Sequence, residues 1–214
     1  MENIERHTHE KAASFYGLGI APSFLDIIEQ MGFKSPTPIQ AQAIPVAIQG
    51  KDIVGIAQTG TGKTLAFGIP MLQRLGQINP VKSAKGGAAE QQFDRVKGQG
   101  LIVLPTRELA LQVDEALSRV GRGIRLKTAV LIGGASMGLQ MRAIANRPQI
   151  IIATPGRLLD HLQQRSIHLN DVKIVVLDEA DRMLDMGFAP QIKLILRLLP
   201  RERQTMLFSA TMPP

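Results

Sequence analysis

The chain has 214 residues, 44% of them apolar and 20% charged, which is the composition of an ordinary globular domain with a buried core. The absence of cysteine excludes a disulfide framework and a thiolate metal site, and the four histidines show no spacing typical of zinc ligands. A net charge of +7 favours a polyanionic partner, either nucleic acid or an anionic membrane, although charge alone leaves a merely soluble basic protein open.

No apolar run approaches the length of a membrane-spanning helix. The polar N-terminus, residues 1–14, lacks the apolar core of a signal peptide and is predicted to be a flexible tail. These features, together with a cysteine-free chain, lead us to expect a cytoplasmic protein without membrane contact.

In chain order, the spacing of apolar residues predicts helices at 22–31 and 39–48, the first of them capped by Ser23. Beyond them, short apolar runs alternate with helical patterns. The predicted strands are 53–57, 101–104, 127–132, 150–153, 173–177 and 205–208. The helices predicted between and after them are 65–75, 108–120, 137–145, 158–164, 181–186 and 190–199.

The stretch 77–99 differs from its surroundings, because it is polar, rich in Gly and Ala, and carries four basic residues. It predicts a long, exposed and mobile loop. Its basic residues could touch nucleic acid, but a solvated loop is the default interpretation.

The predicted strands are apolar throughout rather than alternating, which is typical of strands buried on both faces. Their alternation with helices predicts an α/β fold, with a mostly parallel central sheet and helices on both faces, forming one domain over residues 15–214. In such sheets ligands bind beyond the carboxyl ends of the strands, and nearly every motif described below follows a predicted strand.

Residues 57–64, Ala-Gln-Thr-Gly-Thr-Gly-Lys-Thr, lie between the first predicted strand and an apolar helix. Gly60 and Gly62 allow a tight turn whose exposed N–H groups form an anion site with the helix N-terminus. Lys63 can reach the β- and γ-phosphates of a nucleotide, and Thr64 can ligate Mg²⁺. The general phosphate-loop pattern begins with Gly, whereas this chain has Ala57 there.

The sequence Asp178-Glu179-Ala180-Asp181 follows the apolar run 174–177. Desolvated carboxylates are costly, and a bound cation is one reason to keep them there. Asp178 would hold Mg²⁺, directly or through water, and Glu179 would orient or deprotonate the water that attacks the γ-phosphate. The alternative is an acidic helix N-terminus stabilised by the helix dipole, but the glycine loop favours the catalytic interpretation, with Lys63 as the third catalytic residue.

The glycine loop, the acidic quartet and Ser209-Ala210-Thr211 occur in this order, and together they resemble the N-terminal RecA-like domain of DEAD-box ATP-dependent RNA helicases. Residues 32–40 resemble the Q motif of that family, within a Q-motif region at 15–50. The family's glycine loop also begins with Ala. The resemblance covers residues 15–213, interrupted mainly by 77–99, and implies an ATP-hydrolysing enzyme with ATP and Mg²⁺ as cofactors.

The amide of Gln40 presents a donor and an acceptor side by side, a pair that can bridge N6 and N7 of adenine. By resemblance, Gln40 selects ATP over other nucleotides. Phe15 lies 32 − 15 = 17 residues before Gly32, where the family places an aromatic ring against adenine; the alternative is a helix-packing anchor. The full set of predicted nucleotide-binding residues is Phe15, Lys34, Gln40, Thr59, Gly60, Thr61, Gly62, Lys63 and Thr64, with Thr64 and Asp178 as the Mg²⁺ ligands.

Three further stretches resemble the RNA-contacting motifs of the family, and each follows a predicted strand. Glycine N–H groups, Thr hydroxyls and Arg guanidinium groups are partners for phosphate, so the expected contact follows the RNA backbone with little sequence specificity. The predicted RNA-binding residues are Pro105, Thr106, Arg107, Gly133, Gly134, Thr154, Pro155, Gly156 and Arg157. For Gly133 and Gly156 the alternative is a plain turn or helix start.

Ser209 and Thr211 follow the last predicted strand, where short hydroxyls can hydrogen-bond Asp181. By resemblance, these three residues couple the nucleotide site to the RNA side. The family pattern continues beyond Pro214 with a second RecA-like domain, which carries arginine fingers and the other half of the RNA groove. We therefore expect 1–214 to be a monomer that binds nucleotide and turns it over poorly. In the longer protein, hydrolysis would be coupled to separating short RNA duplexes.

Three alternatives remain open from the sequence. The first is an ATP-dependent RNA clamp or scaffold without processive unwinding, and the second is a DNA helicase. The third, a small-molecule phosphotransferase, is least favoured because nothing resembles an acceptor-substrate lid.

Overall fold

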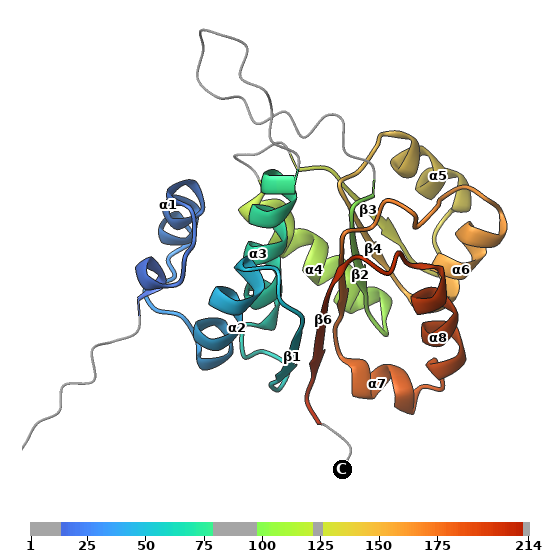
Figure 1. Cartoon of the computed structure of the whole chain (residues 1–214). Helices are drawn as coiled ribbons and strands as arrows, with labels where there is room; N and C mark the ends of the chain where they lie inside the picture. The colour runs from blue at the N-terminus through green and yellow to red at the C-terminus, as the bar shows by residue number, and fades with distance from the viewer. Residues whose placement is uncertain (1–13, 79–97, 122–125, 212–214) are drawn as a thin grey trace, which may run out of the picture.

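The computed structural model describes residues 14–78, 98–121 and 126–211 (Figure 1). Six parallel strands form one sheet in the order β1-β6-β5-β2-β4-β3. The strands are β1 (Ile53–Ile56), β2 (Gly100–Val103), β3 (Thr128–Leu131), β4 (Ile150–Ala153), β5 (Ile174–Leu177) and β6 (Gln204–Ser209). The predicted parallel α/β fold is confirmed.

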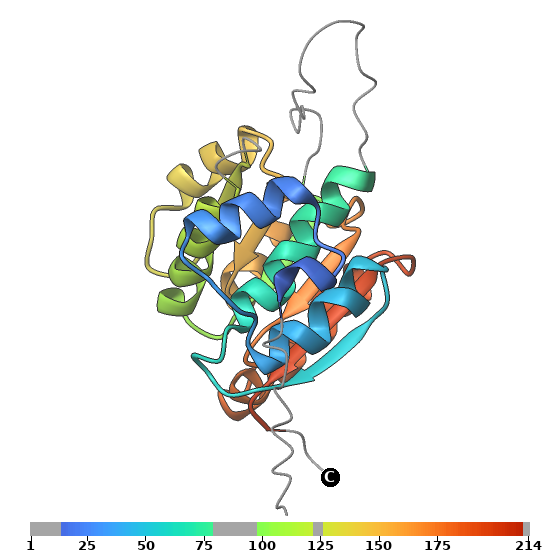
Figure 2. The same ribbon diagram turned by 90° about the vertical axis from the view of Figure 1, so that its left-hand side faces the viewer.

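A short 3-10 turn and eight α-helices accompany the sheet in the described ranges. They are η1 (Phe15–Gly17), α1 (Pro22–Gln30), α2 (Pro38–Ile48), α3 (Lys63–Ile78), α4 (Arg107–Val120), α5 (Met137–Ala145), α6 (Pro155–Gln163), α7 (Ala180–Asp185) and α8 (Ala189–Leu198). Helices α1 to α4 lie on one side of the sheet, with α1 outermost and against α4, and α5 to α8 lie on the other side (Figures 1 and 2).

The three central strands show why the layers form. All residues of β2, β4 and β5 are buried, and successive side chains join the two opposite hydrophobic cores in turn. Ile102, for example, packs in the core under α1 to α4, whereas its neighbour Val103 packs in the core under α5 to α8. Each fully buried side chain of this kind stabilises the fold by about 1.5–3 kcal/mol.

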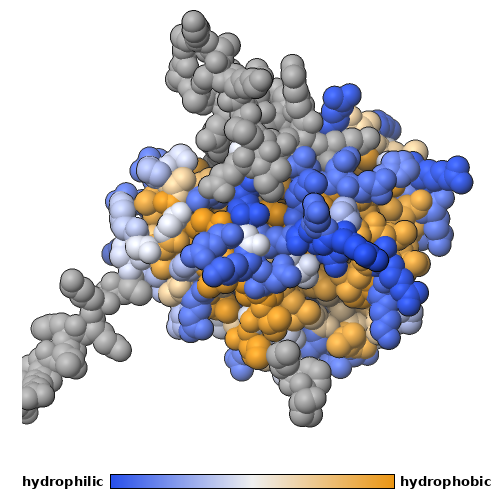
Figure 3. Space-filling view, viewed as in Figure 1, coloured by the Kyte–Doolittle hydropathy of each residue, from blue (hydrophilic) through white to orange (hydrophobic). Residues whose placement is uncertain are grey.

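Strand β1 departs from the prediction that every strand is buried on both faces. Val54 and Ile56 are each 56% exposed, while Gly55 between them is buried. Strand β1 is exposed because it is an edge strand with only β6 beside it, and α2 packs against one of its faces. Apolar areas also interrupt the hydrophilic surface on the lower part of the face shown in Figure 3.

Two helix ends differ from the sequence expectation. Ser23 does not cap α1, because Pro22 occupies the first helical position and the cap residue is Ala21. Helix α3 continues to Ile78 rather than ending near Leu75, so the predicted loop begins at least two residues later. The predicted tail lies almost entirely, and the 77–99 loop mostly, outside the described residues. None of the helices in the described part of the chain is long and apolar enough to cross a membrane.

Because all six strands are parallel, their carboxyl ends meet at one edge of the sheet, and every predicted motif that follows a strand lies there. The phosphate loop, the 209–211 segment and the acidic quartet follow three adjacent strands, β1, β6 and β5. The three predicted RNA-contacting stretches follow the other three, β2, β4 and β3. The sheet edge is thus divided into two halves that meet between β5 and β2, where the Asp178 N–H donates to Val103 O at 3.1 Å.

Candidate functional site

The glycine loop forms a turn between β1 and α3. Gly60 and Gly62 have φ values of 84° and 94°, in the left-handed region that favours glycine. Thr61 closes the loop by donating its hydroxyl to Gln58 O at 2.6 Å. Lys63 and Thr64 are the first residues of α3, so the exposed loop and the positive end of the helix dipole face the same space.

Gln40 is bound to this loop from the side. Its Nε2 donates to Gly62 O at 3.0 Å, and its Oε1 accepts the Thr37 N–H at 3.0 Å, which caps α2. The side chain is 3% exposed, and a Cβ added to Gly62 would collide with Nε2. The structure therefore couples the Q-motif segment to the phosphate loop, a link that sequence spacing did not suggest. The contact of Gln40 with adenine stays a prediction.

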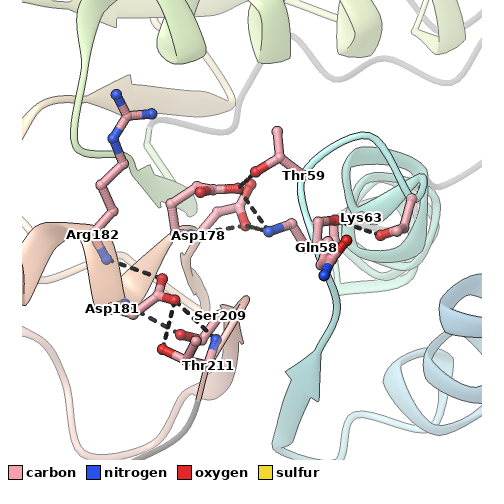
Figure 4. A network of polar contacts seen from close by, with 10 residues as sticks. Gln58, Thr59, Lys63, Asp178, Asp181, Arg182, Ser209 and Thr211 are labelled. Atoms are coloured by element: carbon pink, nitrogen blue, oxygen red, sulfur yellow. Dashed lines mark hydrogen bonds and ion pairs between the residues drawn. The ribbon is translucent and has the colours of Figure 1, made fainter.

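Lys63 and the acidic pair form a buried ionic cluster (Figure 4). The Lys63 Nζ lies 2.7 Å from Glu179 Oε1 and 3.6 Å from Asp178 Oδ1. Thr59 Oγ1 donates to the same Glu179 oxygen at 2.8 Å. All three charged side chains are at most 7% exposed, so this pairing takes place largely without water.

The backbone and the electrostatics of the acidic pair are both unusual. Glu179 has φ 55° and ψ 46°, a left-handed conformation that non-glycine residues adopt at a cost. Burial raises the pKa of Asp178 to about 6, against the attraction of Lys63, which lowers it. A strained backbone and a poorly solvated carboxylate are features that concentrate at functional sites.

Asp181 links the acidic quartet to the end of β6. The backbone N–H and the hydroxyl of Thr211 both donate to Asp181 Oδ2 at 2.9 Å, and the Asp181 N–H donates to Ser209 Oγ at 3.2 Å. Burial alone would raise the pKa of Asp181, but the hydrogen bonds from Thr211 and neighbouring groups outweigh it and lower that pKa. The three residues assigned to coupling therefore do form one hydrogen-bonded group (Figure 4).

A cavity of about 360 Å³ lies between η1, α1 and the start of the Q-motif segment. Phe15, Lys34 and Phe33 are among the residues that line it. Phe15 is only 4% exposed and also belongs to the main hydrophobic core, so the packing-anchor role holds, and stacking on a base stays a prediction. The volume of the cavity is within the ordinary range for small-molecule sites.

The predicted RNA-binding residues differ in what they offer to a ligand. Arg107, Gly134 and Gly156 are exposed, whereas Pro105 and Pro155 are buried. Gly134 has φ 73°, and a Cβ there would collide with Arg107 Nη1, so the loops after β2 and β3 touch each other. Thr106 Oγ1 accepts the Leu109 N–H and caps α4. Arg157 is only 14% exposed.

Sequence reasoning missed Gln140 and His161, which are buried beside Arg157. The Arg157 guanidinium and the His161 ring both contact the Gln140 amide oxygen. The only signal in the sequence is a polar side chain on the apolar face of each helix, which is too common a pattern to identify a site.

No group of three or more His, Asp or Glu residues is arranged to hold a metal ion within residues 14–78, 98–121 and 126–211. The oxygens of Asp178 and Thr64 are hard donors of the kind that Mg²⁺ prefers, and Mg²⁺ usually binds with only one or two protein ligands.

Comparison with known proteins gives consistent matches. The sequence profile of the DEAD/DEAH box helicase family matches residues 37–214. The DEAD-box ATP-dependent RNA helicase CshA of Bacillus subtilis is 46% identical over 200 residues, which are 94% of this chain and 37% of that protein. The ATP-dependent rRNA helicase rrp3 of Aspergillus fumigatus is 48% identical over 200 residues, or 93% of this chain and 39% of that protein.

Among solved structures, a DEAD box protein from the hyperthermophile Methanococcus jannaschii superposes with a TM-score of 0.81 and 35% identity, covering 94% of this chain and 50% of that one. The chain thus spans well under half the length of the curated relatives it matches.

Proposed function

This chain belongs to the DEAD/DEAH box helicase family, and from that premise we propose that it is the ATP-binding domain of an ATP-dependent RNA helicase. The observation that carries the proposal is the contact between Lys63 at the start of α3 and the carboxylates of Asp178 and Glu179 at the end of β5. It joins the phosphate-binding and water-activating groups of an ATPase at the carboxyl edge of a parallel sheet.

Nucleotide binding would use the groups that converge on the glycine loop. The N–H groups of residues 59–64 and the Lys63 ammonium would hold the phosphates. Asp178 and Thr64 would hold Mg²⁺, which when bound neutralises the phosphate charge. The triphosphate would compete with Glu179 for Lys63, and once the ion pair opens, the Glu179 carboxylate is free to accept a proton from water.

The base would bind near Phe15, Lys34 and Gln40. Because Oε1 and Nε2 of Gln40 each make one bond within the chain, the adenine would use the second lone pair of Oε1 and the second hydrogen of Nε2. Through its bond to Gly62 O, Gln40 would then connect the bound base directly to the phosphate loop.

Replacing Gln40 by alanine is expected to weaken the preference for adenine over guanine nucleotides by about tenfold or more, because the only amide that reads the base edge is lost. Fluorescence titration with labelled ADP and GDP measures the ratio. Gln42→Ala is the matched control, because Gln42 lies on the same helix and is exposed. An unmodified chain that binds GDP as tightly as ADP would contradict this role.

RNA would bind along the β2, β4 and β3 half of the edge, where Arg107, Gly134 and Gly156 are exposed. These groups recognise phosphate and sugar rather than bases, so preference for RNA over DNA would come from 2′-hydroxyl contacts and backbone shape. Comparison of RNA and DNA as stimulators of the longer protein separates this proposal from a DNA helicase. Intact Lys63, Thr64 and Glu179 argue against a clamp that never hydrolyses ATP.

The chain 1–214 is expected to bind Mg·ATP and to hydrolyse it at least about 10³-fold more slowly than the longer RNA-stimulated protein, because we propose that a second RecA-like domain supplies arginine fingers. Single-turnover hydrolysis by the two proteins, each with and without oligouridine, measures this difference. RNA-stimulated turnover by 1–214 at the rate of the longer protein would refute it. The same comparison with Glu179→Gln tests whether the residual rate belongs to this site.

A further inference from the structure

The glycine pair Gly133–Gly134 is held from both sides by side chains outside the loop. Gln140 Nε2 donates to the carbonyl of Ile132, the residue before the pair, at 2.9 Å. Arg157 Nη1 donates to the carbonyl of Ala135, the residue after it, at 3.0 Å. The backbone on each side of the two glycines is therefore fixed, although glycine itself imposes little conformational restriction.

Gln140 connects this loop to the 154–157 loop. Its Oε1 accepts from Arg157 Nη1 at 3.4 Å and lies 2.9 Å from His161 Nε2 on α6. Because Nε2 of the amide must face the Ile132 carbonyl, the amide oxygen must face Arg157 and His161, and only one orientation satisfies all partners. Gln140 is 5% exposed and His161 is fully buried, so water does not compete for these bonds.

The protonation state of His161 follows from the same geometry. His161 Nε2 carries the proton that it donates to Gln140, and Nδ1 lies 2.7 Å from Ser166 Oγ, whose hydroxyl also lies within donating distance of His161 O at 3.0 Å. Burial, reinforced by the Arg157 charge and opposed by Asp160, lowers the pKa of His161, which keeps the ring neutral. The neutral Nε2–H tautomer keeps the bond to Gln140 Oε1 without placing a second cation beside Arg157.

Arg157 is placed as a bridge rather than as a free phosphate ligand. Its side chain is 14% exposed, its Nη1 is shared between Ala135 O and Gln140 Oε1, and its Nε lies 3.4 Å from Asp160 Oδ2. A guanidinium can span these acceptors because its donors lie in a rigid plane, whereas a lysine ammonium is a single point on a flexible stem.

We propose that Gln140 and Arg157 are positioning residues that hold the 133–134 and 154–157 loops in one fixed arrangement, matched to successive phosphates of a single RNA strand. The proposal rests on the proposed RNA-binding function. It changes the role of Arg157 from a direct RNA contact to a residue that positions the two loops. The exposed glycines Gly134 and Gly156 present the backbone to the strand, and the cluster of Arg157 with the buried Gln140 and His161 sets their separation.

The test measures binding of fluorescein-labelled oligouridine to the chain 1–214 by anisotropy over a series of salt concentrations. Gln140→Met and Arg157→Lys are each expected to weaken binding about tenfold. Each variant keeps the net charge of the chain, but its two loops are no longer held in the arrangement that fits the RNA strand. The slope of log K against log[salt] should stay the same, since each phosphate contact to a single strand contributes roughly 0.7 to it. Labelled ADP should bind both variants with unchanged affinity.

Gln204→Met is the matched control. Gln204 is 3% exposed and its amide donates to Ala47 O and Lys51 O at 2.9 and 2.8 Å, but it lies at the start of β6, the opposite end from the carboxyl edge. It should lose stability as Gln140→Met does and keep its RNA affinity. If Arg157→Lys keeps full RNA affinity, or if Gln140→Met binds RNA as tightly as Gln204→Met does, the positioning role of Gln140 and Arg157 is refuted.

A second measurement needs no RNA. Amide hydrogen exchange of Gly133, Gly134 and Gly156 should accelerate in Gln140→Met and stay unchanged in the 59–64 loop, and the His161 Nε2 proton signal should shift. If Gln140→Met does not fold, Gln140→Glu takes its place, because Glu keeps the acceptor oxygens and lacks the hydrogen for Ile132 O. Failure of the unmodified chain to bind RNA would refute its proposed RNA contacts, whereas unchanged exchange in the variants would refute the positioning role alone.

Discussion

Lys63→Met is expected to lower the free energy of unfolding by about 3–5 kcal/mol near neutral pH, because it leaves the buried carboxylates of Asp178 and Glu179 without their cation. The loss should shrink as the pH is lowered, since an unpaired buried carboxylate can take up a proton instead of remaining charged. The variant should also lose nucleotide binding by at least about 100-fold, because the ammonium proposed to contact the phosphates is gone. Urea unfolding at several pH values and titration with labelled ADP measure the two effects.

The double variant Lys63→Met/Glu179→Gln separates the two roles of Lys63. Replacing Glu179 by an amide removes the carboxylate that lies closest to Lys63, so most of the stability should return while nucleotide binding stays as weak as in Lys63→Met. Lys193→Met, at an exposed position of α8, controls for loss of a lysine charge. If Lys63→Met unfolds at the same urea concentration as the unmodified chain throughout the pH series, the buried ion pair does not exist in solution.

Asp178→Asn is expected to stabilise the chain at neutral pH and to have no effect on stability near pH 4. Burial raises the pKa of Asp178 from 3.8 to about 6, so the folded chain holds this proton more tightly than the unfolded chain does. The stability that the protonated carboxyl contributes is fully present below the unfolded pKa and is lost as the pH rises through the folded one. The asparagine side chain does not titrate, so the variant keeps its stability over that range. Its free energy of unfolding should exceed that of the unmodified chain by up to about 3 kcal/mol at neutral pH.

Urea unfolding of both chains between about pH 4 and pH 8 tests the sign and the window of this effect. Asp171→Asn, at an exposed carboxylate, is the control and should show no such trend. A stability difference that does not change with pH, or an Asp178→Asn variant that is less stable at neutral pH, contradicts the assignment. The same variant should bind ADP without the gain that we expect Mg²⁺ to give the unmodified chain, because an amide is a poor ligand for that ion.

The two predictions describe one property of the site. Asp178 and Glu179 are kept in a buried, strained position that lowers stability, and Lys63 offsets only part of that cost. Such an arrangement is typical of a site whose charged groups are to be engaged by a ligand. Bound nucleotide and metal would complete the charge balance that the chain alone leaves incomplete.

Much of the fold and the site could be predicted from local sequence. Apolar runs separated by helical patterns indicated the parallel sheet, and the glycine loop and acidic quartet were located because turn geometry and ligand chemistry require particular residue types at fixed spacing. The parallel arrangement then placed every motif that follows a strand at one edge of the sheet, whatever the order of the strands. The contact of Asp181 with Thr211 also followed, since both lie just beyond strand ends.

The tertiary structure decided what depends on which strands and helices become neighbours. The strand order leaves β1 at the edge and so exposes Val54 and Ile56, although their sequence is that of a buried strand. Gln40 reaches Gly62, Lys63 reaches Glu179, and Arg157 reaches Ala135 across sequence separations of 22, 116 and 22 residues. Residue type and spacing within a motif are local properties that the sequence determines by itself. Contacts between motifs depend on how whole elements pack, and only the folded chain determines them.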